Sequence, residues 1–211
     1  MNGHMKPADI EKNSFAIITA ELGDRTFPAG IDQIVKRVIH TSADFDYADN
    51  LCFSPGVVEQ AKAALEAGAT VVTDTNMALA GISKGTLAKL GGRAVCLMAD
   101  EDVAREAKAR GVTRATVSME HAAKLDGPLI FAIGNAPTAL IRLHELIGEG
   151  AVRPALVIGV PVGFVNVVES KELFVGGDTP YIIARGRKGG SNVAAAIVNA
   201  LLYQIVKREG F

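Results

Sequence analysis

The chain has 211 residues, of which 49% are hydrophobic and 21% are charged, a composition typical of a globular protein with room for a pocket. Its formal net charge of −1 leaves no basic surplus to neutralise many phosphates, so we expect no nucleic-acid partner. The longest apolar runs, such as Ala155–Val165, are interrupted by Gly and Pro and are shorter than the roughly 20 residues of a membrane span, so we expect no membrane anchor.

The two cysteines, Cys52 and Cys96, lie in apolar contexts and form no CxxC or Cys/His spacing. That pattern argues against a disulfide framework and against a structural zinc site. The spacing of His, Asp and Glu resembles no metal site either. We therefore expect no metal site and a cytoplasmic location. Residues 1–6 lack the apolar segment of a signal peptide, and we expect them to be a tag remnant or a disordered N-terminus.

The first sixty or so residues have mainly helical patterns. The three predicted helices are Pro7–Glu21, Pro28–Ile39 and Pro55–Ala67, and prolines near helix starts are typical of a first helical turn. No Ser/Pro-rich linker separates this region from the rest of the chain, so residues 1–211 are interpreted as a single domain.

From Thr70 onward, short apolar runs alternate with segments of helical period, as in strands joined by crossover helices. The predicted strands are Thr70–Asp74, Ala94–Met98, Pro128–Ile133, Ala155–Val160 and Tyr181–Arg185. The predicted helices between and after them are Asp100–Arg110, Thr138–Gly148 and Asn192–Arg208, and helices are expected to end near Gly68, Gly111 and Gly150. This order predicts a three-layer α/β/α fold of flavodoxin-like character, with a mainly parallel five-stranded sheet and additional N-terminal helices.

Ligands of open parallel sheets bind beyond the carboxyl ends of the strands, so the polar residues after each predicted strand are the first candidates. These polar segments are Thr73–Asn76, Gly134–Thr138, Pro161–Phe164, Glu169–Lys171 and Arg185–Asn192. Their number indicates that this edge of the sheet carries the binding site.

The last of these segments is a Gly-rich turn flanked by cations at the start of a helix. Free backbone N–H groups at such a turn suit a carboxylate or phosphate oxygen. The alternative, given equal weight, is a tight turn with Ser191 as the helix N-cap. Asn135 also has two interpretations. Its segment is a turn in which Pro137 starts a helix, and the same turn would allow a ligand to approach closely. The first predicted strand is not followed by a GxGxxG motif, and the chain contains no GxxxxGK[ST] motif. We therefore expect no nucleotide-binding loop.

His40 closes a helical stretch, and Arg37 lies one turn earlier on the same face. A histidine there suits acid or base chemistry near neutral pH, with Arg37 attracting an anionic substrate. The spacing alone favours the alternative, a C-terminal histidine stabilised by the helix macrodipole.

His121 and His144 lie in predicted amphipathic helices and are interpreted as structural. No GxSxG motif supports a Ser-His-Asp hydrolase. These residues alone indicate an α/β enzyme or binding protein for an anionic small molecule.

Seven motifs run in order from about Ser14 to the last predicted helix and cover nearly the whole chain. They are Ser14–Ile18, Arg37–His40, Phe53–Pro55, Ala132–Leu140 (AIGNAPTAL), Pro161–Val165 (PVGFV), Glu169–Lys171 (ESK) and Arg185–Ser191. In these motifs the chain resembles the precorrin-8X methylmutases, also called cobalt-precorrin-8 methylmutases, of cobalamin (vitamin B12) biosynthesis.

The resemblance implies an isomerase. The methyl group on C-11 of the corrin precursor migrates to C-12 by a [1,5]-sigmatropic shift, which converts precorrin-8X into hydrogenobyrinate or the cobalt form into cobyrinate. The migrating methyl is already on the ring, so no S-adenosylmethionine is consumed, in agreement with the missing nucleotide-binding motifs.

The family's catalytic histidine matches His40, which is implied to donate a proton or a hydrogen bond to the conjugated macrocycle near the migrating group. This reverses the preference that spacing alone gave. An arginine suits the substrate's peripheral carboxylates because its planar fork binds them through two hydrogen bonds. The predicted substrate-binding residues are, by match to the family, Ser14, Arg37 and Arg114, and, from strand-end position alone, Asn135 and Ser191.

The implied partner is a corrinoid tetrapyrrole, whose broad apolar faces suit walls from Met77, Phe164 and Val165. No cofactor is expected, because any cobalt is held by the substrate macrocycle. The resemblance to the family also implies a homodimer. A further expectation is that the product is transferred to other enzymes of the corrin pathway. Metal-free and cobalt substrates both stay open, and the Thr41–Asp44 loop slightly favours the cobalt branch.

Two other classes of function are compatible with parts of this pattern. One is a non-catalytic corrinoid carrier, which would use the same pocket and deliver the corrin to the next enzyme. The other is a flavodoxin-like nucleotide or flavin protein, which the missing phosphate loop disfavours.

Overall fold

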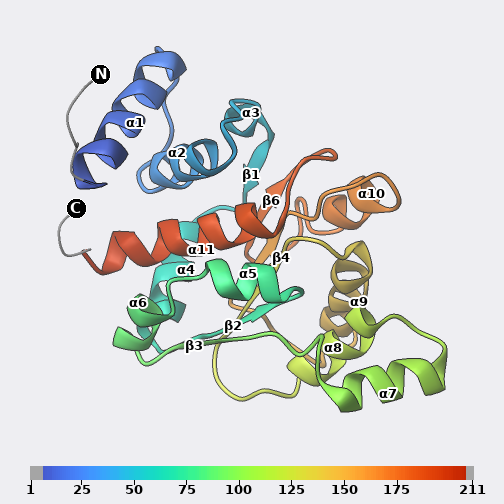
Figure 1. The fold of residues 1–211 in the computed structure, drawn as a ribbon. Coiled ribbons are helices and arrows are strands. Elements are labelled where there is room, and N and C mark those ends of the chain that lie inside the picture. Colours follow the sequence, from blue (N-terminus) through green and yellow to red (C-terminus); the bar gives the residue numbers. More distant parts are fainter. Residues whose placement is uncertain (1–6, 208–211) are drawn as a thin grey trace.

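A computed structural model describes residues 7–207 of the chain (Figure 1). Six strands form one sheet in the order β1-β6-β5-β4-β2-β3. All neighbouring pairs are parallel except β1 and β6, which are antiparallel. The strands are β1 (Leu51–Phe53), β2 (Thr70–Thr73), β3 (Arg93–Val95), β4 (Leu129–Ile133), β5 (Leu156–Gly159) and β6 (Tyr181–Ala184).

The five parallel strands confirm the predicted fold class. Numbered among themselves, they have the spatial order 2-1-3-4-5, which is the flavodoxin-like order. Every residue of β2, β4, β5 and β6 is buried, as expected where helices cover both faces of a sheet. Continuous apolar runs therefore identified these strands correctly.

The prediction of a five-stranded sheet is wrong by one strand. Residues Leu51–Phe53 form β1 at the edge of the sheet, where Cys52 lies opposite Ile183 of β6. A segment of three residues is too short to show a strand pattern in sequence, and its conformation depends on pairing with β6. The N-terminal region is therefore mainly, but not wholly, helical.

Helices cover both faces of the sheet and complete the three layers. On one face α11 packs against α2, α4, α5 and α6, and α1 packs against the outside of α2. On the other face α8 packs against α7 and α9, and α9 packs against α10. Figure 1 shows α11 lying between α2 and α5. The helices are α1 (Pro7–Leu22), α2 (Ile31–Ser42), α3 (Tyr47–Asn50), α4 (Val57–Glu66), α5 (Asn76–Gly81), α6 (Lys84–Lys89), α7 (Glu101–Arg110), α8 (Arg114–Ala122), α9 (Pro137–Gly148), α10 (Val167–Glu172) and α11 (Ser191–Ile205).

The six helices whose ranges were predicted are present, with ends that shift by up to three residues. Pro137 occupies the first turn of α9, and Gly111 ends α7 in the left-handed conformation at φ 66°. The helix α8 was predicted only as an amphipathic helix containing His121, with no range. The helices α3, α5, α6 and α10 were not predicted, because four to six residues do not complete two helical turns. The helix predicted to reach Arg208 ends at Ile205, because Val206 after it is extended. The expectation for residues 1–6 lies outside the described residues. Within residues 7–207, no helix has the length and apolar character needed to span a membrane.

Candidate active site

The order of the parallel strands reverses between β2 and β4, the position where flavodoxin-like folds bind their ligands. Asp74 follows β2 at this point and is 1% exposed. Its carboxylate accepts hydrogen bonds from the backbone N–H groups of Gly134 (2.9 Å), Asn135 (2.8 Å) and Ala136 (2.6 Å). Burial raises the pKa of the Asp74 carboxyl, and the three N–H donors oppose that rise. The Asp74 carboxylate thus occupies the three backbone N–H donors to which an anionic ligand would otherwise bind at this position.

The loop after β4 lies directly against the start of α11. A Cβ atom on Gly134 would lie 2.7 Å from the Cα atom of Ser191, so this contact requires glycine. The Ser191 hydroxyl is 2.7 Å from that of Thr75, which caps α5 by accepting from the N–H of Ala78. Ser191 is buried and is not the N-cap of α11, because Gly190 occupies that position. The N-cap interpretation of Ser191 is therefore wrong, while its role toward substrate stays a prediction.

The C-terminal end of α2 reaches the same edge of the sheet. Lys188, in the loop after β6, forms ion pairs with Asp44 and Asp46 in the turn after α2. The backbone N–H of Arg185 also donates to the carbonyl of Asn50, just before β1. His40 lies in the last turn of α2, four residues before Asp44, so these contacts bring it to the carboxyl edge of the sheet.

His40 is exposed and stacks on Phe15 of α1, with ring centroids 5.3 Å apart and an interplanar angle of 22°. The guanidinium carbon of Arg37 lies 4.8 Å from the centre of the same ring and 5.3 Å from the ring of Tyr203. Arg37 also forms an ion pair with Glu11 of α1. The structure thus places His40 and Arg37 side by side on one aromatic support, as their spacing predicted.

Ser14 lies beside Phe15 on α1, and its hydroxyl donates to the carbonyl of Ile10 at 3.0 Å. The side chain is half-buried, and the two lone pairs of its oxygen remain able to accept. A pocket of about 250 Å³ adjoins Arg37 between α1, α2 and α11. It is smaller than the roughly 300–1,000 Å³ of pockets that enclose drug-sized ligands, so a tetrapyrrole does not fit within it.

Arg114 and Asn135 lie together at another part of the molecule. Arg114 is the first residue of α8, and Thr113 before it caps the helix by accepting from the N–H of Thr116. The Thr113 hydroxyl also donates to that of Thr138, in the first turn of α9, close to Asn135. Arg114 and Asn135 are both exposed. Figure 1 shows α1 and α2 on one side of the molecule and α8 and α9 on the other, so the predicted residues form two groups.

Apolar side chains are exposed at the carboxyl edge. Met77 after β2 is 72% exposed, and Phe164 and Val165 after β5 are 83% and 77% exposed. The guanidinium carbon of Arg187 lies 5.5 Å from the centre of the Phe164 ring. Exposed apolar groups beside cations suit a ligand with apolar faces and an anionic rim.

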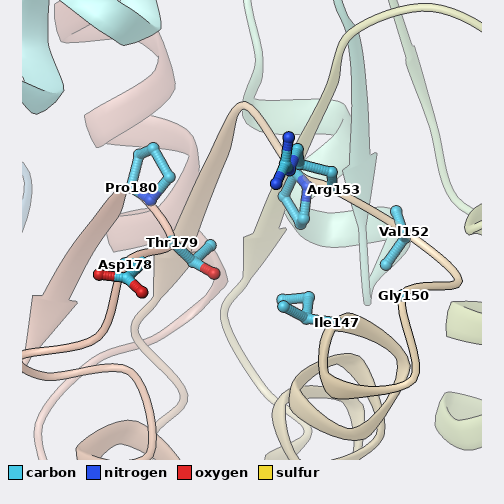
Figure 2. A pocket seen from close by; sticks show the side chains of 8 residues that line it. Ile147, Gly150, Val152, Arg153, Asp178, Thr179 and Pro180 are labelled. Atoms are coloured by element: carbon cyan, nitrogen blue, oxygen red, sulfur yellow. The ribbon is translucent and has the colours of Figure 1, made fainter.

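A larger pocket, of about 590 Å³, lies at the amino ends of β5 and β6. Figure 2 shows Val152 and Arg153 on one of its loops and Asp178 and Thr179 on another. These loops precede β5 and β6, whereas the predicted site residues follow β4 and β6 or lie on α1, α2 and α8. This pocket is therefore distinct from the predicted site.

Known proteins resemble this chain along most of its length. A model of the precorrin-8X methylmutase family matches residues 9–204. The cobalt-precorrin-8 methylmutase of Salmonella typhimurium is 46% identical over 95% of this chain and 96% of the relative. The precorrin-8X methylmutase of Pseudomonas aeruginosa is 43% identical over 91% of this chain and 93% of the relative. The crystal structure of precorrin-8X methylmutase from Thermus thermophilus is 41% identical and superposes with a TM-score of 0.84, over 92% of this chain and 94% of that one.

This chain belongs to the precorrin-8X methylmutase family. The family prediction made from seven sequence motifs is confirmed, and so is the prediction of an isomerase of this type. Relatives named for cobalt-precorrin-8 and for precorrin-8X have similar identities to this chain, 46% and 43%, so identity alone does not separate the two substrates. The part of the chain that the structure describes contains no group of three or more His, Cys, Asp or Glu residues arranged to hold a metal ion.

Three residues at the carboxyl edge of the sheet received no role from sequence. Asp74, Lys171 and Lys188 all lie in polar segments singled out after strands, yet their partners are far away in the chain or are backbone groups. Lys171 is fully buried and donates to the carbonyls of Gly186 and Lys188, both at 2.8 Å. In the sequence Lys171 stands between Ser170 and Glu172, so no local pattern marks it as a buried charge.

Proposed function

We propose that this protein moves the C-11 methyl group of precorrin-8X or cobalt-precorrin-8 to C-12, giving hydrogenobyrinate or cobyrinate. Family membership supports the reaction type. The observation that carries the proposal is His40, an exposed imidazole stacked on Phe15 at the carboxyl edge of the sheet, with the Arg37 guanidinium against the same ring. An exposed imidazole beside a fixed cation is suited to an anionic substrate that needs a proton.

In the proposed mechanism His40 acts as the general acid. Its imidazolium donates a proton or a hydrogen bond to the conjugated macrocycle, which withdraws electrons from the π-system and lowers the barrier to migration. The bond between the methyl group and C-11 breaks as the bond to C-12 forms, and the proton then returns to His40. Substrate and product are isomers, so no co-reactant is needed. A positioned general acid contributes roughly 10²–10⁴-fold to such a step.

We assign the substrate's carboxylates to the two groups of polar residues. Ser14 precedes Phe15, the ring that stacks on His40, and Arg37 lies one turn before His40 on α2. Arg114 is exposed at the start of α8, and Asn135 is exposed just before α9. Arg37 is already paired with Glu11, so a substrate carboxylate would share or replace that partner. The fifth predicted residue, Ser191, holds Thr75 in this structure and would reach substrate only through a change in that contact.

A homodimer is part of the same proposal. The two polar groups lie on different sides of the chain (Figure 1), and neither the small pocket beside Arg37 nor the loops of Figure 2 joins them. A second copy would extend the exposed apolar surface of Met77, Phe164 and Val165 into a wall for a tetrapyrrole. We further propose a cytoplasmic location, which suits the free Cys52 and Cys96, and transfer of the product to other enzymes of the corrin pathway.

The proposal is tested by adding purified protein to metal-free precorrin-8X and, separately, to cobalt-precorrin-8, and following the visible spectrum. We expect many turnovers per protein with the natural substrate, which the Thr41–Asp44 loop suggests is the cobalt form. Stoichiometric binding without methyl migration would contradict catalysis and support the corrinoid carrier. A bound yellow chromophore in the purified protein would instead support a flavin protein.

His40→Ala tests the assigned residue. We expect kcat to fall roughly 10²–10⁴-fold while the dissociation constant of the product stays within about threefold. The matched control is His144→Ala, which removes an exposed histidine on α9 that contacts Phe174 edge-on. Turnover near the wild-type rate in the His40 variant would remove this residue from the mechanism.

A further inference from the structure

The loop between β6 and α11 is joined by ion pairs to the turn after α2. The Lys188 ammonium nitrogen lies 2.6 Å from an oxygen of Asp44 and 2.6 Å from an oxygen of Asp46. These carboxylates are separated from Lys188 by more than 140 residues of sequence. The ion pairs raise the pKa of Lys188, and the hydrogen bond from Lys188 lowers that of Asp44, so both of these groups are charged near neutral pH. We call Lys188, Asp44 and Asp46 the clamp.

The α2 side of the clamp has a defined shape. Ala43 ends the helix in the left-handed conformation at φ 53°, and its N–H donates to the carbonyl of Ile39 at 2.7 Å. The Asp44 N–H donates to the Ser42 hydroxyl, and the Asp46 N–H donates to the Asp44 carboxylate. A non-glycine residue keeps this conformation only where its surroundings enforce it. The clamp helps to hold Ala43 in this left-handed conformation, within one helical turn of His40.

The loop that carries Lys188 is held by α10. Lys171, which is fully buried, donates to the carbonyls of Gly186 and of Lys188 itself. Burial lowers the pKa of Lys171 to about 8. Its neighbour Glu172 pairs with Arg185 at the foot of the same loop. The backbone from which Lys188 projects is therefore fixed by groups on α10.

We propose that Lys188 is a positioning residue that sets the orientation of His40 toward the substrate by holding Asp44 and Asp46. This inference rests on the proposed function. The Lys188 side chain is 47% exposed, and exposed ion pairs contribute little to overall stability. Its structural effect is local, because it joins the helix end that carries His40 to the loop that begins α11. Small misplacements of a catalytic group have large effects on rate.

The alternative role for Lys188 is direct binding of a substrate carboxylate, and the carboxylate partners distinguish the two. If Lys188 positions His40, removing the charges of Asp44 and Asp46 has the same consequence as removing the lysine. If Lys188 binds substrate, neutralising its protein partners leaves the cation free for the ligand and does not weaken binding. The comparison of variants therefore decides between the roles.

The experiment measures kcat and the product dissociation constant, by visible absorbance, for Lys188→Met, for the Asp44→Asn/Asp46→Asn double variant and for the triple variant. We expect kcat to fall about tenfold or more in each, with no further loss in the triple variant and with binding within about threefold of wild type. Lys188→Arg should recover part of the rate. The control is Lys62→Met, which removes an ion pair with Glu59 on α4 and should leave kcat unchanged.

Three results would overturn the inference. The first is wild-type kcat in folded Lys188→Met, and the second is weaker product binding in Lys188→Met that the double variant does not reproduce. A readout independent of activity is the NMR signal of the His40 imidazole, which Lys188→Met should shift or broaden while that of His144 stays in place. An unchanged His40 signal would also overturn it. If wild-type protein fails to rearrange the substrate yet this signal moves, the proposed function fails and the positioning contact stands.

Discussion

Asp74 and His40 both lie at the carboxyl edge of the sheet, but the protein holds them by different means. Asp74 is 1% exposed and is fixed by three backbone N–H groups of the loop after β4. His40 is exposed and is supported by the ring of Phe15 and by the more distant clamp of Lys188. The buried contacts of Asp74 provide a rigid floor, and the exposed contacts of His40, the proposed catalytic group, leave it adjustable. Substitutions at the first should therefore change stability, and substitutions at the second should change rate.

The largest effect is expected for Asp74→Ala, which removes the acceptor of three N–H groups, one in a buried hydrogen bond and two in partly buried ones. We expect a loss of about 3–5 kcal/mol in the free energy of unfolding, because each unsatisfied buried donor costs roughly 1–3 kcal/mol. Urea unfolding followed by circular dichroism measures it. Asp74→Asn keeps one acceptor oxygen and should lose less. The control Asp126→Ala changes an exposed carboxylate and should stay within about 0.5 kcal/mol of wild type, and an equally small loss for Asp74→Ala would contradict the rigid floor.

A somewhat smaller effect is expected for Lys171→Met, because two carbonyls lose their donor. The free energy of unfolding should fall by about 2–4 kcal/mol at pH 7, again measured with urea, whereas Lys124→Met at an exposed position should have little effect. Lys171 also anchors the loop from which Lys188 of the clamp projects. The variant should therefore lose rate as well as stability.

The same lysine predicts a pH dependence with a definite sign. Burial lowers its pKa from 10.5 in the unfolded chain to about 8 in the folded protein. Between pH 8 and 10.5 the unfolded chain holds a proton that the folded protein does not, so this group makes stability rise with pH in that window. Other groups titrate there too, so the measured quantity is the difference between wild type and Lys171→Met at pH 7.5 and pH 10. A difference that stays constant or shrinks would show that Lys171 keeps its proton when folded.

The sequence predicted the sheet better than the site because the two leave different traces in it. Strands buried on both faces are continuous apolar runs, and β2, β4, β5 and β6 were found from them. The edge strand β1 was missed because three residues carry no period. The role of Asp74 was missed because its partners are backbone N–H groups, which have no signature in sequence.

The pairing of His40 with Arg37 on one helix face was predictable from their spacing, since both lie on α2. The contact of His40 with Phe15 was not, because it depends on how α1 packs against α2. The same is true of Lys188 with Asp44, which needs the chain to return after more than 140 residues. The functional role of His40 came from the motifs that resemble the family and stays a prediction.

The smallest effect on stability is expected for Phe15→Leu, which keeps apolar bulk and removes the ring beneath His40 and Arg37. The free energy of unfolding should change by less than about 1 kcal/mol, because α1 keeps its other contacts with α2 and Arg37 keeps Glu11. The rate should fall several-fold, because the imidazole loses the surface that orients it. Urea unfolding and kcat measured on the same preparation test both statements.

The matched control is Phe164→Leu, at a ring that is 83% exposed and touches Arg187. In the proposed site this ring faces the corrinoid, so its loss should weaken product binding and leave kcat nearly unchanged. Opposite behaviour, with weaker binding in Phe15→Leu and a lower kcat in Phe164→Leu, would exchange the roles of the two aromatic residues. A loss of several kcal/mol in Phe15→Leu would instead make the His40 support as rigid as the Asp74 floor, because both contacts would then be part of the folded core.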